Sequence, residues 1–268
     1  MQVLQQVSNY SQSGVTVTVP AGTDNVKGAW VELVASTTYD MTALETCVLV
    51  GSAAACSMLV DIGVGPAGSE VVLVPDLYAE THTSVPMTMG TRIPVKIPAG
   101  TRISARAQTN DSIARNASVY MLPESTGATP IFGRGFQRVV QYGCVPASTS
   151  LTPVDPGGSA NTKGAWVELC AASDIPAKAL CACFASNRNT NLTTGDYLVD
   201  IGIGTAGNEV VLLPNYFVSV NTTSDVLREY TTVLPVELPV GTRIVARAQS
   251  TVTDATDRVV YTQIHLFG

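Results

Sequence analysis

Apolar and polar residues alternate over short runs along most of this chain of 268 residues. Valine and threonine alternate in Val15-Thr-Val-Thr-Val19, and Pro20 ends the run. Between Lys27 and Ser36, Ala29, Val31 and Leu33 fall on one face of an extended chain. A period of two residues is the pattern of a β-strand, whose successive side chains point to opposite faces. No stretch keeps a period of 3.6 residues over three helical turns, so the pattern predicts strands and no long helix.

The same criteria predict further strands in the first half, and Pro98-Ala-Gly100 between two of them is a turn signature. One predicted strand, at 70–74, is continuously apolar and is expected to end at Pro75, with an irregular segment following at 76–90. About seven or eight short strands with frequent turns predict an antiparallel β-sandwich of jelly-roll type. The other predicted strands of this half are 42–51, 57–63, 92–97, 101–108 and 117–122.

The chain repeats itself. Lys27-Gly-Ala-Trp-Val-Glu-Leu33 returns unchanged as Lys163-Gly-Ala-Trp-Val-Glu-Leu169, and the blocks that follow return in the same order. These blocks are 59–75, which returns as 198–214, and 100–108, which returns as 241–249. Repeats of about 125 residues have the size of ordinary domains. The sequence therefore predicts an all-β protein of two tandem, homologous antiparallel sandwiches, with residues 1–125 as the first and residues 126–268 as a linker plus the second.

Both repeats contain a literal GxGxxG pattern, at Gly63, Gly65 and Gly68 and again at Gly202, Gly204 and Gly207. A dinucleotide-binding loop requires a helix directly after these glycines, because the helix N-terminus faces the pyrophosphate. Here the next residues, 69–75 and 208–214, are rich in valine and leucine and end in proline. We therefore expect a turn between two strands, with glycine supplying positive φ, and no cofactor.

Charged residues make up only 13% of the chain, and the same acids and arginines recur in both repeats. Because charge is scarce, we expect these groups to pair across a sheet or between subunits. Two converging carboxylates would instead allow glycoside hydrolysis, which we rank lower. The candidates are Glu32, Asp61, Glu70, Arg102, Arg106, Glu168, Asp200, Glu209, Arg243 and Arg247.

The two tryptophans, Trp30 and Trp166, occupy equivalent positions in the repeats. A core or interface anchor is the favoured interpretation, and an exposed platform for a sugar ring is the alternative. The two histidines are interpreted as an exposed loop residue, His82, and a structural residue of the last strand, His265.

The net charge of −6 and a pI near 4.9 argue against direct nucleic-acid binding, which needs a basic surface. No apolar run approaches the roughly 18 residues that span a bilayer, and residues 1–6 do not resemble a secretion signal. The six cysteines are expected to be mainly small buried side chains, with a disulfide between Cys47 and Cys56 left open. No cysteine and histidine spacing predicts a metal site.

Two blocks of the form LVDIGxGxAGxE and PxGTRIxARAQ, without an enzyme signature, resemble small virion structural proteins of tailed bacteriophages. The resemblance covers residues 27–122 and 163–268. It implies a non-enzymatic protein that resides in the virion, decorates the capsid or serves as a neck or tail accessory, and contacts capsid, portal, neck or tail proteins.

Low charge and duplication favour a homo-oligomer, and three chains would offer six similar domains to a hexameric platform. A carbohydrate-binding protein or adhesin, with one site per repeat, is the alternative function.

Overall fold

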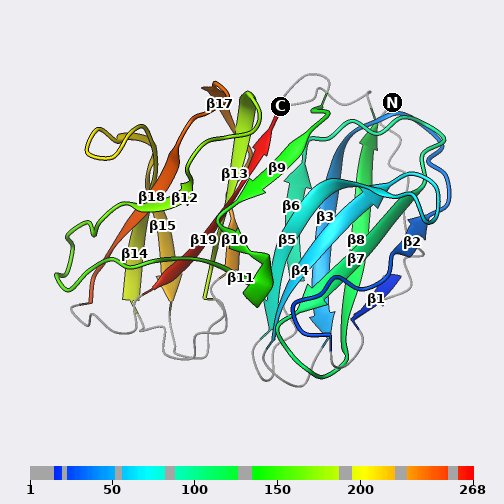
Figure 1. The fold of residues 1–268 in the computed structure, drawn as a ribbon, viewed down its shortest axis with the longest axis horizontal. Coiled ribbons are helices and arrows are strands. Elements are labelled where there is room, and N and C mark those ends of the chain that lie inside the picture. The colour runs from blue at the N-terminus through cyan, green and yellow to red at the C-terminus, as the bar shows by residue number, and fades with distance from the viewer. Residues whose placement is uncertain are drawn as a thin grey trace.

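The chain forms two β-sandwiches that lie side by side in the computed structural model (Figure 1). Their strands belong to four antiparallel sheets, and the described helical structure is one short 3₁₀ turn, Pro146–Ser148. No described helix is long and apolar enough to cross a membrane. The described residues are 15–19, 23–51, 56–81, 88–125, 135–186, 195–220, 228–252 and 259–268.

The first repeat contains two four-stranded sheets. One has the strand order β1-β8-β3-β6 and the other has the order β2-β7-β4-β5. The strands are β1 (Val15–Val19), β2 (Val31–Val34), β3 (Met41–Gly51), β4 (Cys56–Val64), β5 (Val71–Thr81), β6 (Thr88–Ile93), β7 (Ile103–Thr109) and β8 (Arg115–Ser125).

The second repeat copies this arrangement. Its four-stranded sheet has the order β12-β18-β14-β15, and its larger sheet follows β11-β19-β13, with β16 and β17 on the free side of β13. Two additional short strands, β9 and β10, extend the larger sheet. The strands are β9 (Val139–Tyr142), β10 (Cys144–Val145), β11 (Ser150–Val154), β12 (Val167–Cys170), β13 (Ala177–Ala185), β14 (Gly195–Ile203), β15 (Val210–Val220), β16 (Arg228–Tyr230), β17 (Leu234–Leu238), β18 (Ile244–Ser250) and β19 (Val260–Phe267).

Both repeats have the pairing of an eight-stranded jelly roll, in which two sheets exchange strands through Greek-key connections. The all-β prediction with antiparallel sandwiches is confirmed. The alternation of apolar and polar residues determines which face of a strand is buried. Val17 in β1 is buried, whereas Thr16 and Thr18 on either side of it are exposed. The strands of the first repeat end at Ser125, and those of the second begin at Val139.

The prediction that a strand ends at Pro75 is wrong. β5 continues through Pro75 to Thr81, because a bulge accommodates the proline: Ile62 pairs with Val74 and Val60 pairs with Leu77. Proline is tolerated at such a position since no ladder hydrogen bond is required there. Asp76 adopts a positive φ of 50°, and Asn215 has the same conformation in β15. The predicted irregular segment thus contains most of β5 and the start of β6.

Each sandwich has its own apolar core. Leu44, Val60 and Ile103 are fully buried in the first core, and Phe184, Val199 and Ile264 are fully buried in the second. The first cluster also contains Val139, Ala179, Cys181 and Phe267 of the second repeat, and a third, smaller cluster joins the repeats as well. It contains Leu59 and Tyr78 from the first repeat and Leu151, Cys183 and Ala185 from the second.

Candidate functional site

The GxGxxG pattern forms the tight turn between β4 and β5, as the sequence predicted. Gly65 and Gly68 have φ values of 113° and 81°, which L side chains rarely adopt, and Gly204 and Gly207 repeat this geometry in the second copy. No helix follows either turn among the described residues. At both positions the glycines form a turn between two strands.

Gly63 is glycine for a different reason. A Cβ atom built on it would lie 2.6 Å from the indole ring of Trp30, and a Cβ on Gly202 would lie 2.7 Å from the ring of Trp166. Each tryptophan thus lies directly against the backbone of the neighbouring strand, and only glycine leaves room for it. Each indole is half-buried, and the guanidinium of Arg106 or Arg247 lies over its ring, at 4.5 Å and 4.3 Å from the centroid.

The charged candidates of the first repeat lie on the outer face of the β2-β7-β4-β5 sheet. Near the glycine turn, Arg102 donates to Glu32 at 2.8 Å and to Glu70 at 2.9 Å. Glu70 also accepts a hydrogen bond from the amide of Gly68. Burial opposes ionisation of Glu70, but hydrogen bonds from backbone amides and from Arg102 outweigh it and lower the pKa of this carboxyl.

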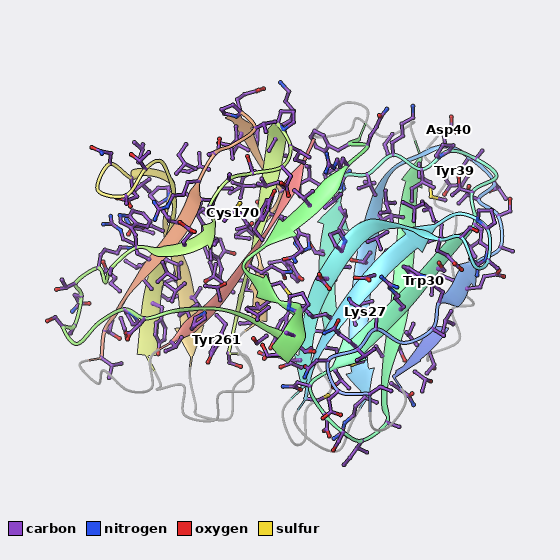
Figure 2. The ribbon with its side chains drawn as sticks, in the orientation of Figure 1. Lys27, Trp30, Tyr39, Asp40, Cys170 and Tyr261 are labelled. Atoms are coloured by element: carbon purple, nitrogen blue, oxygen red, sulfur yellow. The ribbon has the colours of Figure 1, made fainter. Side chains whose placement is uncertain are left out.

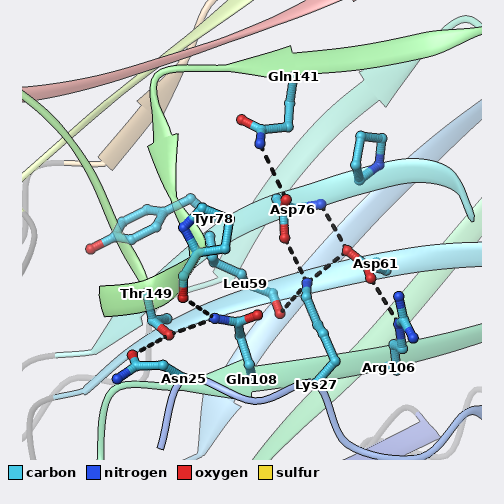
Figure 3. Close-up of polar contacts among 12 residues, drawn as sticks. Asn25, Lys27, Leu59, Asp61, Asp76, Tyr78, Arg106, Gln108, Gln141 and Thr149 are labelled. Atoms are coloured by element: carbon cyan, nitrogen blue, oxygen red, sulfur yellow. Dashed lines mark hydrogen bonds and ion pairs between the residues drawn. The ribbon is translucent and has the colours of Figure 1, made fainter.

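Asp61 is the centre of a second set of contacts on the same face (Figure 3). One carboxylate oxygen accepts from Lys27 Nζ at 2.7 Å, and the other accepts from Arg106 Nε at 2.8 Å. Lys27 also lies 2.7 Å from Asp76, whose amide donates to Asp61. Lys27 and Trp30 both lie in the segment that leads into β2, on this side of the repeat (Figure 2).

The second repeat reproduces these contacts. Asp200 accepts hydrogen bonds from Lys163 at 2.7 Å and from Arg247 at 2.9 Å. Arg243 donates to Glu168 at 2.7 Å and to Glu209 at 3.1 Å. Burial would raise the pKa of Asp200, but hydrogen bonds from Lys163, the backbone and Arg247 lower it. Asn215 stands where the first repeat has Asp76, so its side chain adds no second carboxylate for Lys163.

The repeats contact each other through the outer face of the first repeat's β2-β7-β4-β5 sheet. Tyr78 on β5 donates to Glu80 at 2.6 Å and shares a bond with Ser57 at 2.9 Å. Glu80 accepts from the amide and hydroxyl of Ser186, at 3.2 Å and 2.8 Å, and Tyr230 accepts from the amide of Tyr78. Glu80 and Tyr78 are buried, so these bonds form away from water.

The bulge of β5 makes further contacts with the second repeat. His265 Nε2 donates to the carbonyl of Pro75 at 2.9 Å, and Gln263 donates to the carbonyl of Asp76 at 2.7 Å. The side chain of Gln141 on β9 donates to the Asp76 carboxylate at 3.2 Å, as Figure 3 shows. Burial favours the neutral imidazole and lowers the pKa of His265. The surface of the second repeat that covers β5 is the outward face of the sheet that contains β13 and β19.

All ten charged candidates and both tryptophans therefore belong to one repeated sheet face. Sequence reasoning missed Lys27 and Lys163, although both open the repeated KGAWVEL block. It also missed Asp76, Tyr78 and Glu80, which have no identical counterpart in the second repeat and so gave no repeat signal. His82 lies outside the described residues.

Cys144, Cys170 and Cys181 are free thiols. The disulfide left open between Cys47 and Cys56 involves Cys47, whose side chain lies outside the described residues. Cys181 and Cys183 point to the same face of β13, and both are buried in clusters that contain residues of the first repeat. Among the residues that the structure describes, no group of three His, Cys, Asp or Glu side chains is arranged to hold a metal ion.

No family model and no curated protein matches the chain. Among solved structures, it is similar to the N-terminal CBM22-1-CBM22-2 tandem domain of Xyn10C from Paenibacillus barcinonensis, with 9% identity and a TM-score of 0.28. That alignment covers 99% of this chain and 91% of the other. It is also similar to infectious bursal disease virus, Gx strain, with 10% identity, a TM-score of 0.24, and coverage of 98% and 72%. TM-scores this low carry no argument about function.

Proposed function

We propose that this protein is a non-enzymatic structural component of a tailed-phage virion, which decorates the capsid or serves as a neck or tail accessory. The observation that carries the proposal is the packing of the repeated charged face against a neighbouring domain. In the first repeat this face packs against another jelly roll, and its carboxylates are bonded to cations of the same repeat. Such a face is suited to assembly. The bacteriophage setting comes from the resemblance of the repeated blocks.

The charge arrangement favours assembly over glycoside hydrolysis. A glycosidase needs one carboxylic acid that stays protonated until it donates to the leaving group. Asp61 and Asp200 each accept hydrogen bonds from a lysine and an arginine, and the pKa of Asp200 is lowered. Asp200, held in this way, stays ionised and is a poor proton donor. Glu70 and Glu209 are bonded to Arg102 and Arg243 in the same manner.

Carbohydrate binding at the tryptophans stays an alternative with less support. A stacking platform needs a free face on the indole ring. Arg106 and Arg247 each lie over one ring, and the edge of each ring lies against the glycine of the adjacent strand. Removing the arginine would uncover the ring. Titration of the indole fluorescence with glycans, in the wild type and in Arg106→Ala, separates the alternatives: a glycan response in the wild type would favour the adhesin.

Immunogold electron microscopy of purified native particles tests the proposal. Antibodies raised against this chain should label particles at a regular position on the capsid, neck or tail. Particles from a phage that lacks the gene provide the control for non-specific labelling. If the chain is made during infection but is absent from purified particles, the proposal is wrong.

A further inference from the structure

Equivalent strips of β5 and β15 differ in exposure: one is covered and the other is exposed to solvent. Pro75–Glu80 begins at the bulge of β5 and lies under the second repeat. The matching residues of β15 are Pro214–Ser219. Phe217 stands at the position of Tyr78 and is 57% exposed, whereas Tyr78 is 1% exposed. Asn215 and Ser219 are also exposed, whereas Asp76 and Glu80 are buried.

The exposed strip is also the less polar of the two. Asp76, Tyr78 and Glu80 supply two carboxylates and a phenol in the covered strip, and Asn215, Phe217 and Ser219 supply no charge in the exposed one. Surfaces that stay exposed to water normally contain the charged residues, and surfaces that become buried normally contain few of them. This inversion indicates that β15 is covered when the protein does its work.

The covering partner follows from the duplication. Within the chain, β5 is covered by the outward face of the sheet formed by β11, β19 and β13. The equivalent sheet of the first repeat is formed by β1, β8 and β3. Of its described outward residues, Thr16, Glu45 and Asn116 are exposed and Ser118 is half-buried. We propose that the β15 strip, Pro214–Ser219, binds the outward face of the β1-β8-β3-β6 sheet of a second copy of this chain.

This contact is head-to-tail. Each chain offers one β15 strip and one receiving sheet, so successive chains are joined by the same relation that joins the two repeats. Such contacts close into a ring or grow into a filament, depending on the rotation between neighbours. A ring of three chains would present six jelly rolls. The inference names the self-association surface for the proposed structural role, but it rests on the fold and not on the identity of the particle.

The experiment compares three single variants of the full-length chain by sedimentation velocity over a range of concentrations. Phe217→Glu places a charge in the centre of the strip and should raise the dissociation constant at least about 30-fold, as expected for a central aromatic anchor. Ser118→Arg, on the receiving sheet where the second repeat has Tyr261 in its contact, should have a comparable effect. Val240→Glu, at an exposed valine of the β17–β18 turn, should assemble like the wild type. Circular dichroism and thermal melting establish that each variant is folded.

Mixing the two defective variants gives the decisive outcome. Phe217→Glu keeps an intact receiving sheet, and Ser118→Arg keeps an intact β15 strip. Their equimolar mixture should therefore form one-to-one dimers and nothing larger. A wild type that stays monomeric at all concentrations, a Phe217→Glu variant that assembles normally, or a mixture that remains monomeric would overturn the inference. Immunogold labelling does not depend on any of these results, so a failed surface and a failed virion role are distinguishable.

Discussion

The hydroxyl of Tyr78 provides a sensitive test of the polar group that lies buried beneath the second repeat. Tyr78→Phe removes one oxygen and leaves the ring in place. It also installs the residue that the second repeat carries at the same position, Phe217. The lost oxygen donates to the buried Glu80 carboxylate at 2.6 Å and is bonded to Ser57 at 2.9 Å.

The expected cost is about 2 kcal/mol, because a hydrogen bond to a buried charged group contributes roughly 1.5–3 kcal/mol. A carboxylate that loses a donor in a buried site keeps its desolvation penalty. For a chain of this size the corresponding decrease in Tm is about 4–8 °C. The matched control is Phe217→Tyr, which adds the same oxygen at an exposed site and should change stability by less than about 0.5 kcal/mol.

Urea unfolding followed by tryptophan fluorescence and by circular dichroism measures both variants. Trp30 and Trp166 report on different repeats, so coincident transitions also show whether the repeats unfold together. If Tyr78→Phe unfolds at the wild-type urea concentration, or if Phe217→Tyr is destabilised as strongly, the buried hydrogen bonds of the Tyr78 hydroxyl do not stabilise the fold.

Three further predictions concern the core of the repeated face and the pH response. Gly63→Ala should destabilise the chain by about 1–3 kcal/mol in urea unfolding, because its Cβ would overlap the Trp30 ring, and most of that cost should vanish in the double variant with Trp30→Leu. Asp200→Asn should cost about 2–3 kcal/mol by leaving Lys163 and Arg247 underpaired, whereas Glu237→Gln, which breaks an exposed pair with Lys178, should cost less than about 0.5 kcal/mol; equal costs would contradict this assignment. His265 has a folded-state pKa below its ordinary value of 6.5, so the unfolded chain binds a proton first and stability falls as the pH decreases through this range. Melting curves from about pH 7 to about pH 5 should therefore have a shallower pH dependence in His265→Gln than in the wild type, and parallel curves would refute the role of this histidine.

The sequence alone was sufficient for the fold class, because the alternation in Val15–Val19 and the glycine turns at Gly65 and Gly204 are local signals. It was insufficient at Pro75, where the bulge opposite Asp61 allows a strand to pass through a proline. The residues that pair as ions were recognisable because they recur in both repeats. The residues of the contact between the repeats, such as Glu80 and Ser186, were not recognisable, since this contact occurs once and leaves no pattern in the sequence.

The residues that recur in both repeats are those that stabilise each jelly roll. The residues that differ between the copies lie on the surfaces through which a jelly roll contacts a neighbour. Tyr78 and Phe217 occupy the same place on equivalent strands, yet one is covered and the other is open. The same contrast holds for Glu80 and Ser219. The positions that diverge, and not those that repeat, define the surface available to a neighbouring chain.

Hydroxyl-radical footprinting of the wild type below and above its assembly concentration tests the central claim most directly, because it reads the exposure of individual side chains. Tyr78 should be protected in both conditions, since the second repeat covers it within the chain. Phe217 should be oxidised readily in the dilute protein and become protected on assembly, while Val240 remains reactive throughout. Equal oxidation of Phe217 in the dilute and the assembled protein would contradict the account.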